Sequence, residues 1–541
     1  MSQQNLNISS AVHLAFKLYE EEKYAECVEV CIQILGVDCT RADVWSLAGI
    51  VMMKLEIYER AVEYFTQASH CAPDDVSHRI NLAEAYRRGK NPQASIAELT
   101  SLLAKQSSLM ENPTLHFNLA KAYSDIEDSQ NSIKHYSIAI KLDPDDLGAM
   151  FNLANAQVSL KHFGEAIELY WSALSRGYLD AGVNLANTYV QIGLFSEALE
   201  VYRAIYSYYK DDSDFLFNYA NALNYANASP QETQTFYQQA IGLNPNKSEY
   251  CINYAHFLLK HLDLAHGFRI YEERKRLPNM LPQGIAKLWC KDMSELRDKN
   301  VLVYYEQGLG DSLMFMRFLP LLQEIAKSTL VLIQEPLLPL FQKWHIPCVS
   351  SIDEVAEYDV AISLLSLPYA LGVSHKQDLQ SLPFCDEQKQ ACGVKKIGIC
   401  FSTDSAFAES ANKNMPLAVL MSALEWVREL GIEIYSLNKA YCEDIHQFEI
   451  IQKPMNDFLQ TYEIIEEMDL VISIDTAVAH LSASMGKHTL VLLNKRYDWR
   501  WGNGISTPWY EHVLCLTQSK MGQWGDVANN LRSYLRSYIK A

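Results

Sequence analysis

Two short turns in the second half of the sequence combine residue types that suit a ligand-binding cleft. The first is EQGLGD, residues 306–311, which follows an apolar run. Gly308 and Gly310 allow a tight turn close to a ligand, and Asp311 stands at the expected start of a helix near Ser312. Two interpretations stay open: Asp311 serves a ligand, or it only caps its helix.

The second turn is DTAVAHL, residues 475–481, which follows the apolar run LVISI and opens another expected helix. Free backbone N–H groups and the positive end of a helix dipole can bind a diphosphate there. The expected donors are the backbone at Thr476 and Ala477, the Thr476 hydroxyl, and His480 one helical turn further on. The alternative is a helix cap followed by a histidine satisfied within the core.

The elements around these turns indicate two α/β lobes. Short apolar or β-branched runs alternate with helical patterns after residue 298. Such runs are typical of parallel strands covered by helices on both faces, and ligands bind at the carboxyl ends of such strands. We expect two Rossmann-like lobes with parallel sheets, residues 299–392 and 393–541. The expected strands are residues 301–305, 329–333, 359–363, 397–402, 470–474 and 489–493.

The first half of the sequence contains an internal repeat. Six residues stand at the offsets of a tetratricopeptide repeat: Trp45, Gly49, Ala61, Phe65, Ala68 and Pro73. The same frame recurs as NLAEAY, NLAKAY, NLANAQ, NLANTY, NYANAL and NYAHFL, and a weaker unit around Ala15 to Cys31 brings the number to about eight repeats. Each repeat is a helical hairpin that must stack on its neighbours. We therefore expect residues 1–276 to form an α-helical superhelix with a concave surface that binds a protein or peptide.

Asparagines recur on the first helix of the repeats and form what we call the Asn ladder. A second set lies three residues after the first, one helical turn on and on the same face. An amide donates and accepts hydrogen bonds, which suits the backbone of an extended peptide. The alternative is that the amides bond to one another and stiffen the array. The ladder comprises Asn81, Asn118, Asn152, Asn184, Asn218 and Asn253, with Asn155, Asn187 and Asn221 as the second set.

The two halves are joined by residues 277–298, which we expect to form a linker. This segment loses the repeat, gains Pro278 and Pro282 and ends in a charged turn. We expect the last repeat hairpin to pack directly on the α/β region after it.

Bulk composition excludes several classes of protein. A chain of 541 residues needs two or more domains. A net charge of −19 argues against a nucleic-acid binder and against binding to anionic membranes. The sequence lacks a signal peptide and any apolar stretch that could span a bilayer, so we expect a cytoplasmic protein without membrane insertion. Its 12 cysteines include no CxxC pair, and we expect neither a metal nor another cofactor.

Across residues 299–530, the sequence resembles the bacterial tetratricopeptide-repeat-linked relatives of the heptosyltransferase family. The residues that carry the resemblance are EQGLGD, DTAVAHL, Asp498-Trp499-Arg500-Trp501 and Pro508-Trp509-Tyr510. That family transfers sugars from nucleotide diphosphates with inversion and without a required metal. The two expected lobes facing a cleft match its GT-B arrangement.

The resemblance also implies roles for single residues. Asp311 would be the general base that takes the proton of the acceptor hydroxyl. Asp475, Thr476 and His480 would bind the nucleotide diphosphate. Lys413, shortly before a proline, would assist the leaving group.

Two segments leave questions open. The loop CFSTDSA, residues 400–406, departs from the family's tryptophan- and asparagine-containing loop, which should face the donor. The identity of the sugar and the level of activity therefore stay open. Trp499, Arg500, Trp501 and Trp509 either border the nucleotide or pack between the lobes.

The Asn ladder resembles that of eukaryotic O-linked N-acetylglucosamine transferase, whose repeat asparagines grip the acceptor polypeptide. The expected function is sugar transfer from a nucleotide-diphosphate sugar to Ser or Thr of a protein held by the repeats. Flagellin or another bacterial surface protein is the expected kind of acceptor. Two alternatives are a glycosyltransferase for a surface glycan or lipid-linked acceptor, and a non-catalytic scaffold with a vestigial transferase domain.

Overall fold

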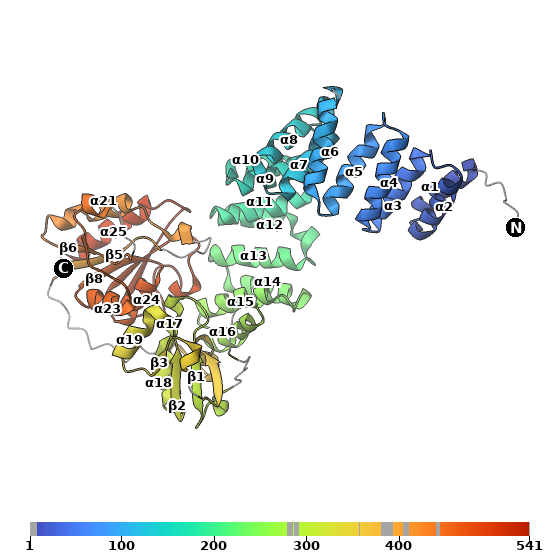
Figure 1. Ribbon diagram of the computed structural model, residues 1–541. Helices are drawn as coiled ribbons and strands as arrows, with labels where there is room; N and C mark the ends of the chain where they lie inside the picture. Colours follow the sequence, from blue (N-terminus) through green and yellow to red (C-terminus); the bar gives the residue numbers. More distant parts are fainter. Residues whose placement is uncertain are drawn as a thin grey trace. The chain divides into compact units, whose positions relative to one another are not determined.

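The computed structural model describes residues 8–105, 107–277, 285, 292–355, 357–379, 393–403, 410–439 and 444–539. Helices alone form the N-terminal part, and helices with parallel strands form the C-terminal part (Figure 1). The expected order, α followed by α/β, is therefore confirmed. The chain divides into two compact units, Met1–Thr188 with Val201–Ile205 and Tyr189–Glu200 with Tyr206–Ala541.

The repeat region consists of helical pairs that pack closely because small residues stand where the helices meet. A Cβ added at Gly49 would lie 2.7 Å from the Phe65 ring, and Ala61 and Ala68 are fully buried. Asp or Asn side chains cap several of these helices, as Asp75 does for α5. The described helices are α1 (Ile8–Glu20), α2 (Tyr24–Val37), α3 (Ala42–Lys54), α4 (Tyr58–Cys71), α5 (Val76–Arg88), α6 (Pro92–Lys105), α7 (Pro113–Asp125), α8 (Ser129–Leu142), α9 (Leu147–Ser159), α10 (Phe163–Ser175), α11 (Leu179–Gln191), α12 (Phe195–Tyr209), α13 (Ser213–Tyr225), α14 (Pro230–Leu243), α15 (Ser248–Lys260) and α16 (Leu264–Tyr271).

Two parallel sheets form the framework of the α/β part, which belongs to the second unit. The first sheet has the strand order β3-β2-β1-β4 and the second has the order β10-β9-β8-β5-β6-β7. All neighbouring strands in these orders run parallel. The strands are β1 (Asn300–Tyr304), β2 (Ser328–Leu332), β3 (Cys348–Val349), β4 (Val360–Ser363), β5 (Lys396–Cys400), β6 (Glu433–Ser436), β7 (Ile451–Gln452), β8 (Leu470–Ile474), β9 (Thr489–Leu493) and β10 (Val513–Thr517).

Helices cover these sheets, and two of them follow the predicted turns. α17 begins after β1, and α24 begins after the fully buried β8. α21 and α25 pack together beside the second sheet (Figure 1). The α-helices of this part are α17 (Leu309–Phe315), α18 (Leu319–Gln323), α19 (Leu338–Lys343), α20 (Leu367–Ala370), α21 (Leu417–Arg428), α22 (Asp444–Gln447), α23 (Phe458–Glu466), α24 (Ala477–Ser484) and α25 (Gly525–Tyr538).

The last repeat hairpin shares a hydrophobic core with the α/β part. Phe268 of α16 is buried, and its ring centroid lies 6.4 Å from that of Phe315 and 6.2 Å from that of Trp509. Tyr271 at the end of α16 belongs to the same core. The hairpin therefore packs directly on the α/β region, as the sequence predicts.

The helix after the first turn starts earlier than the sequence indicated. α17 begins at Leu309 rather than near Ser312, so Asp311 lies inside its first turn. Gly308 is the N-cap, and its N–H donates to Asp311 Oδ2 at 3.1 Å, which stabilises the earlier start.

Several sequence predictions fall outside the described residues. Most of the expected linker, residues 278–284 and 286–291 with Pro278 and Pro282, belongs to this group. So do residues 404–406 of the atypical loop.

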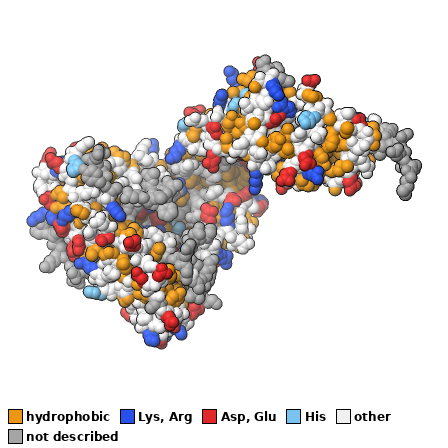
Figure 2. All heavy atoms as spheres, viewed as in Figure 1, with side chains coloured by type: hydrophobic (Ala, Val, Ile, Leu, Met, Phe, Trp, Pro, Cys, Tyr) orange, Lys and Arg blue, Asp and Glu red, His pale blue; other side chains and the backbone are white. Residues whose placement is uncertain are grey.

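None of the helices that the structure describes is long and apolar enough to cross a bilayer. On the face shown in Figure 2, Lys and Arg side chains are interspersed with Asp and Glu.

Candidate functional site

The turns EQGLGD and DTAVAHL lie against each other where α17 meets α24. Gly310 permits this approach, because a Cβ there would lie 2.8 Å from His480 Cδ2 and 3.6 Å from Ala477 Cα. Gly308 has more room, since an added Cβ would meet Asp311 Oδ2 at 3.6 Å. The structure therefore brings the two predicted turns together after the carboxyl ends of β1 and β8.

Asp311 is engaged through both carboxylate oxygens. Oδ1 pairs with the Arg500 guanidinium, and Oδ2 accepts the Gly308 N–H at 3.1 Å. Burial raises the pKa of Asp311, and the opposing effect of Arg500 does not cancel that rise. A raised pKa favours proton uptake, but neither oxygen is free of a partner.

Arg500 joins Asp311 to a second carboxylate. Its Nη1 donates to Asp498 Oδ1 at 2.9 Å. Burial acts to lower the pKa of Arg500, but Asp311 and Asp498 outweigh it and hold the pKa above its ordinary value. Burial acts to raise the pKa of Asp498, but Arg500 outweighs it and lowers this pKa to about 2. Arg500 and Asp498 are therefore charged at neutral pH.

Asp475 forms an ion pair with Lys413, the residue expected to assist the leaving group. Lys413 Nζ donates to Asp475 Oδ2 at 2.6 Å, and Trp501 Nε1 donates to Oδ1 at 2.8 Å. Burial acts to lower the pKa of Lys413, but Asp475 outweighs it and the net shift is upward. The ammonium is therefore charged and oriented.

Thr476 and His480 have mainly internal contacts. Thr476 is the N-cap of α24, and its hydroxyl bonds to groups at the end of β8. His480 is 4% exposed, with Nδ1 2.8 Å from the Tyr510 hydroxyl and its ring stacked 4.8 Å from Trp501. Burial lowers the pKa of His480 to about 4, so the ring is neutral. These contacts agree with the alternative of a satisfied core histidine, and diphosphate binding by this turn stays a prediction.

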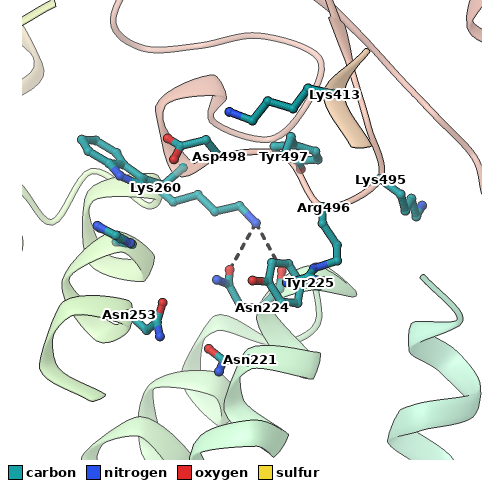
Figure 3. Close-up of a pocket in the computed structure, with 12 residues that line it drawn as sticks. Asn221, Asn224, Tyr225, Asn253, Lys260, Lys413, Lys495, Arg496, Tyr497 and Asp498 are labelled. Atoms are coloured by element: carbon teal, nitrogen blue, oxygen red, sulfur yellow. Dashed lines mark hydrogen bonds between the residues drawn. The ribbon is translucent and has the colours of Figure 1, made fainter. Parts of the chain in front are cut away.

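A pocket of about 230 Å³ opens beside Lys413 (Figure 3). Asn221 of α13 and Asn253 of α15 line it from the repeats, and Asp498 lines it from the second lobe. Figure 3 shows Lys413 and Asp498 on one side of this space and the two asparagines on the other. We call it the cationic pocket, after Lys260, Lys413, Lys495 and Arg496 in its walls.

Three of these four cations were missed by the sequence analysis. Lys495 and Arg496 follow the end of β9 after one intervening residue, Asn494, so their place at the carboxyl end of a parallel strand was a usable signal. Lys260 ends α15, and its Nζ donates to Asn227 Oδ1 at 2.9 Å and to two Asn224 oxygens at 3.2 Å. Burial lowers the pKa of Lys260 to about 8.

Within the described residues, no group of three or more His, Cys, Asp or Glu is placed to hold a metal.

Residues at the end of the repeat region form hydrogen bonds with the EQGLGD turn. Gln307 Nε2 donates to the Tyr271 hydroxyl at 3.0 Å. Arg274 is buried, and it donates from Nε to Glu306 Oε2 at 2.7 Å and from Nη1 to Glu272 Oε1 at 2.8 Å. The position of this turn therefore depends on residues of the repeat region.

The Asn ladder lies on the first helices of the pairs, with its side chains half-buried. Asn184 Nδ2 donates to Asn155 Oδ1 at 2.8 Å, and Asn152 Nδ2 donates to the Gly148 carbonyl at 2.8 Å. These bonds agree with a stiffening role. Asn81 lines another cavity, of about 220 Å³, in the first unit. Peptide binding by the ladder stays a prediction.

The tryptophans near the C-terminus pack against each other and against the lobes. Trp501 and Trp509 are buried, and the rings of Trp499 and Trp509 lie 5.4 Å apart at 72°. Trp499 also lines the cationic pocket. Packing is observed for all three tryptophans, whereas Trp499 also lines the pocket and Trp501 also contacts Asp475 and His480.

Comparisons with known proteins identify the repeats. Residues 48–108, 117–178 and 183–248 match the family described as tetratricopeptide repeat. The chain is 26% identical over 184 residues to DnaJ homolog subfamily C member 7 of Mus musculus, which covers 30% of this chain and 37% of that protein. It is 28% identical over 142 residues to protein O-mannosyl-transferase TMTC3 of Mus musculus, covering 26% of this chain and 13% of that protein.

Among solved structures, MamA from Desulfovibrio magneticus RS-1 is similar with a TM-score of 0.29 and 15% identity, covering 31% of this chain and 93% of that chain. The chain spans only about a third or less of the length of the two curated relatives named above. The family match and the helical pairs together show that the chain contains a region of tetratricopeptide repeats.

Proposed function

We propose that this chain is an inverting, metal-independent glycosyltransferase of the GT-B type. It moves a sugar from a nucleotide-diphosphate sugar to a Ser or Thr hydroxyl of a protein bound by the repeats. The observation that carries the proposal is the cationic pocket, because its walls come from both the repeats and the second lobe. Flagellin and other bacterial surface proteins are candidate acceptors, and we infer a cytoplasmic reaction.

The charge of the pocket supports an anionic donor. The whole chain has a net charge of −19, yet four cations line this one space. Lys413 is oriented by Asp475, and α24 begins two residues after that carboxylate. An ammonium and the N–H groups of a helix N-terminus stabilise negative charge on a departing phosphate.

The repeats support a polypeptide acceptor. Asn221 and Asn253 of the Asn ladder line the same pocket as Lys413. A peptide whose backbone follows the ladder amides would bring a side-chain hydroxyl to the donor. The second lobe would then hold the nucleotide sugar, and the repeats would present the acceptor.

The donor site can be tested by binding alone. A panel of nucleotide sugars and free nucleoside diphosphates is added to the purified chain, and thermal shift and calorimetry report binding. Lys413→Met is expected to weaken nucleoside diphosphate binding roughly 10- to 100-fold, because a charge-assisted phosphate contact is lost.

Lys453→Met is the matched control. The Lys453 side chain is 37% exposed, and its Nζ lies 2.7 Å from Glu467 Oε1. The Lys413 side chain is 35% exposed, and its Nζ lies 2.6 Å from Asp475 Oδ2. This variant should bind like the wild type. If no nucleotide or nucleotide sugar raises the Tm of the wild type, the transferase proposal is contradicted.

A further inference from the structure

One position of the repeats changes its residue type along the array. It lies three residues after the first asparagine of the ladder and therefore on the same helix face. The residue there is Glu84, Lys121, Asn155, Asn187, Asn221 and, in the last repeat, His256. The last repeat thus has an imidazole where the three preceding repeats have an amide.

In those three repeats the amide is tied to a tyrosine of the second helix. The tyrosine hydroxyl donates to the asparagine Oδ1 at 2.5 to 2.7 Å. A donor fixed on Oδ1 leaves the amide nitrogen for other partners. The pairs are Asn155 with Tyr170, Asn187 with Tyr202, and Asn221 with Tyr237.

The last repeat has the same tyrosine position but a different hydrogen bond. Tyr271 lies beside His256, with ring centroids 5.3 Å apart. Its hydroxyl is bonded to Gln307 Nε2 of the EQGLGD turn, at 3.0 Å. Among the described residues, His256 Nε2 has no hydrogen-bond partner although the atom is buried. An unpaired buried nitrogen is costly, so its presence in a folded protein calls for an explanation, of which a catalytic role is one.

His256 lines the cationic pocket together with Lys413 and Asp498. Its ring stacks on Trp499 with centroids 5.8 Å apart and 19° between the planes. Burial lowers the pKa of His256 to about 4, with Asp498 opposing this effect and Arg500 and Arg274 adding to it. The ring is therefore neutral at neutral pH, and a nearby carboxylate can stabilise the imidazolium after a proton is taken up.

The surroundings of Asp311 differ from those of His256. Both of its oxygens are engaged, by Arg500 and by the Gly308 N–H, and it is not among the residues that line the pocket. This geometry suits a residue that positions Arg500 and, through Arg500, Asp498.

We propose that His256 is a catalytic residue of the transfer, and that its Nε2 takes the proton of the acceptor hydroxyl. This inference rests on the proposed function. The hydroxyl oxygen forms the new bond to the anomeric carbon, and the bond from that carbon to the diphosphate oxygen breaks. The electron pair of the broken bond leaves with the nucleotide diphosphate beside Lys413. The hydroxyl proton moves to Nε2 and from there to solvent.

The test measures transfer by the full-length chain from pH 3.5 to 8, a range that includes the pKa of His256, about 4. The donors are UDP-, GDP-, ADP- and dTDP-linked sugars, and the acceptors are proteins that the chain captures from host lysate. A second experiment measures UDP binding. His256→Gln keeps hydrogen-bonding capacity but cannot accept the proton. Exposed His266→Gln is the matched histidine control, and Asp311→Asn is the competing assignment.

His256→Gln is expected to lower the transfer rate at least about 100-fold and to remove the fall in rate on the acidic side of the pH profile. UDP affinity and the circular dichroism spectrum should stay within about twofold of the wild type, as should every property of His266→Gln. Asp311→Asn should retain the acidic fall.

Two results overturn this assignment alone: His256→Gln transfers sugar with the wild-type pH profile, or Asp311→Asn loses the acidic fall that His256→Gln keeps. Absence of any transfer by the wild type overturns the proposed function and this inference with it.

Discussion

Lys260 illustrates how a single side chain sets the charge of the cationic pocket. Its ammonium contacts amide and carbonyl oxygens of Asn224 and Asn227. Burial lowers its pKa to about 8, whereas an ordinary lysine titrates near about 10.4. Lys260 therefore loses its charge at a pH where Lys413, whose pKa is raised, keeps its own.

We predict that anion binding weakens as the pH rises from 7 to 9. Deprotonation of Lys260 through its pKa of about 8 removes a positive charge from the pocket. The affinity for UDP should fall roughly 3- to 10-fold over this interval, as measured by calorimetry. Lys260→Arg keeps its charge and should show a flatter dependence. Equal slopes for the two proteins would mean that Lys260 does not act on the ligand.

Among single residues, a recognisable turn in the sequence indicated Asp475, and the family resemblance indicated Lys413. The structure joins the two although they are 62 residues apart. Lys260 and the proposed base His256 were not predicted, because their surroundings depend on which lobe packs against α15 and no local pattern encodes that packing. The register of the Asn ladder was the one signal that pointed to His256.

At the scale of elements, the crossing of α17 and α24 depends on the absence of a side chain at Gly310. A Cβ there would lie 2.8 Å from Cδ2 of His480, a ring held by Tyr510 and Trp501. The ring has little room to move, because its neighbours are buried as well.

Gly310→Ala should therefore lower the free energy of unfolding by about 1 to 3 kcal/mol through overpacking. Urea denaturation followed by tryptophan fluorescence measures the change. Gly308→Ala is the matched control, since its Cβ would be in ordinary contact at 3.6 Å, and it should cost less than about 1 kcal/mol. Equal losses in the two variants would contradict the role given to Gly310.

The sequence predicted β1, β2, β4, β5, β8 and β9 and missed β3, β6, β7 and β10. β8 and β9 have the expected bounds because they are continuous apolar runs. β3 and β7 have two residues each and lie at sheet edges, so they give no periodic signal. Several hairpin turns in the repeats lack a glycine signal, because their positive φ angles fall on Glu56, Lys161 and Leu262, although Gly177 and Gly193 have positive φ at two other turns.

At the scale of the whole molecule, buried charges join the last repeat to the first lobe within the second unit. Arg274 pairs with Glu272 and Glu306, and its Nη2 also donates to Ser366 at 2.7 Å. Burying these charges costs free energy that the mutual pairing offsets. Removal of Arg274 takes this buried cation from Glu306, whereas Glu272 keeps its ion pair with Lys275 at 2.6 Å.

Arg274→Met should lower the free energy of unfolding by about 3 to 5 kcal/mol. Arg276→Met removes a nearby arginine that is 52% exposed and pairs with Glu273 at 3.1 Å, so it should cost less than about 1 kcal/mol. Chemical denaturation of both full-length variants measures the difference. If Arg274→Met is as stable as Arg276→Met, the buried network does not hold the last repeat to the lobe.

The order of an α-helical array followed by an α/β region was predictable because each part has its own hydrophobic period. The division into two compact units was not predictable from the sequence. The second unit includes Tyr189–Glu200 and the repeats from Tyr206 onward, and within it α16 shares a core with Phe315 and Trp509. A repeat face that packs on another repeat and one that packs on a lobe have the same sequence pattern.

The most direct test of the central claim is a mass measurement on protein acceptors. The purified chain is incubated with nucleotide sugars and host lysate, and modified peptides are sequenced. We predict a sugar mass on Ser or Thr of at least one protein. The triple variant with Asn184, Asn187 and Asn218 changed to Ala should lose most of this signal but still hydrolyse the donor. Nucleotide-sugar consumption without a modified protein, or an equal signal from the triple variant, would contradict transfer to a protein held by the repeats.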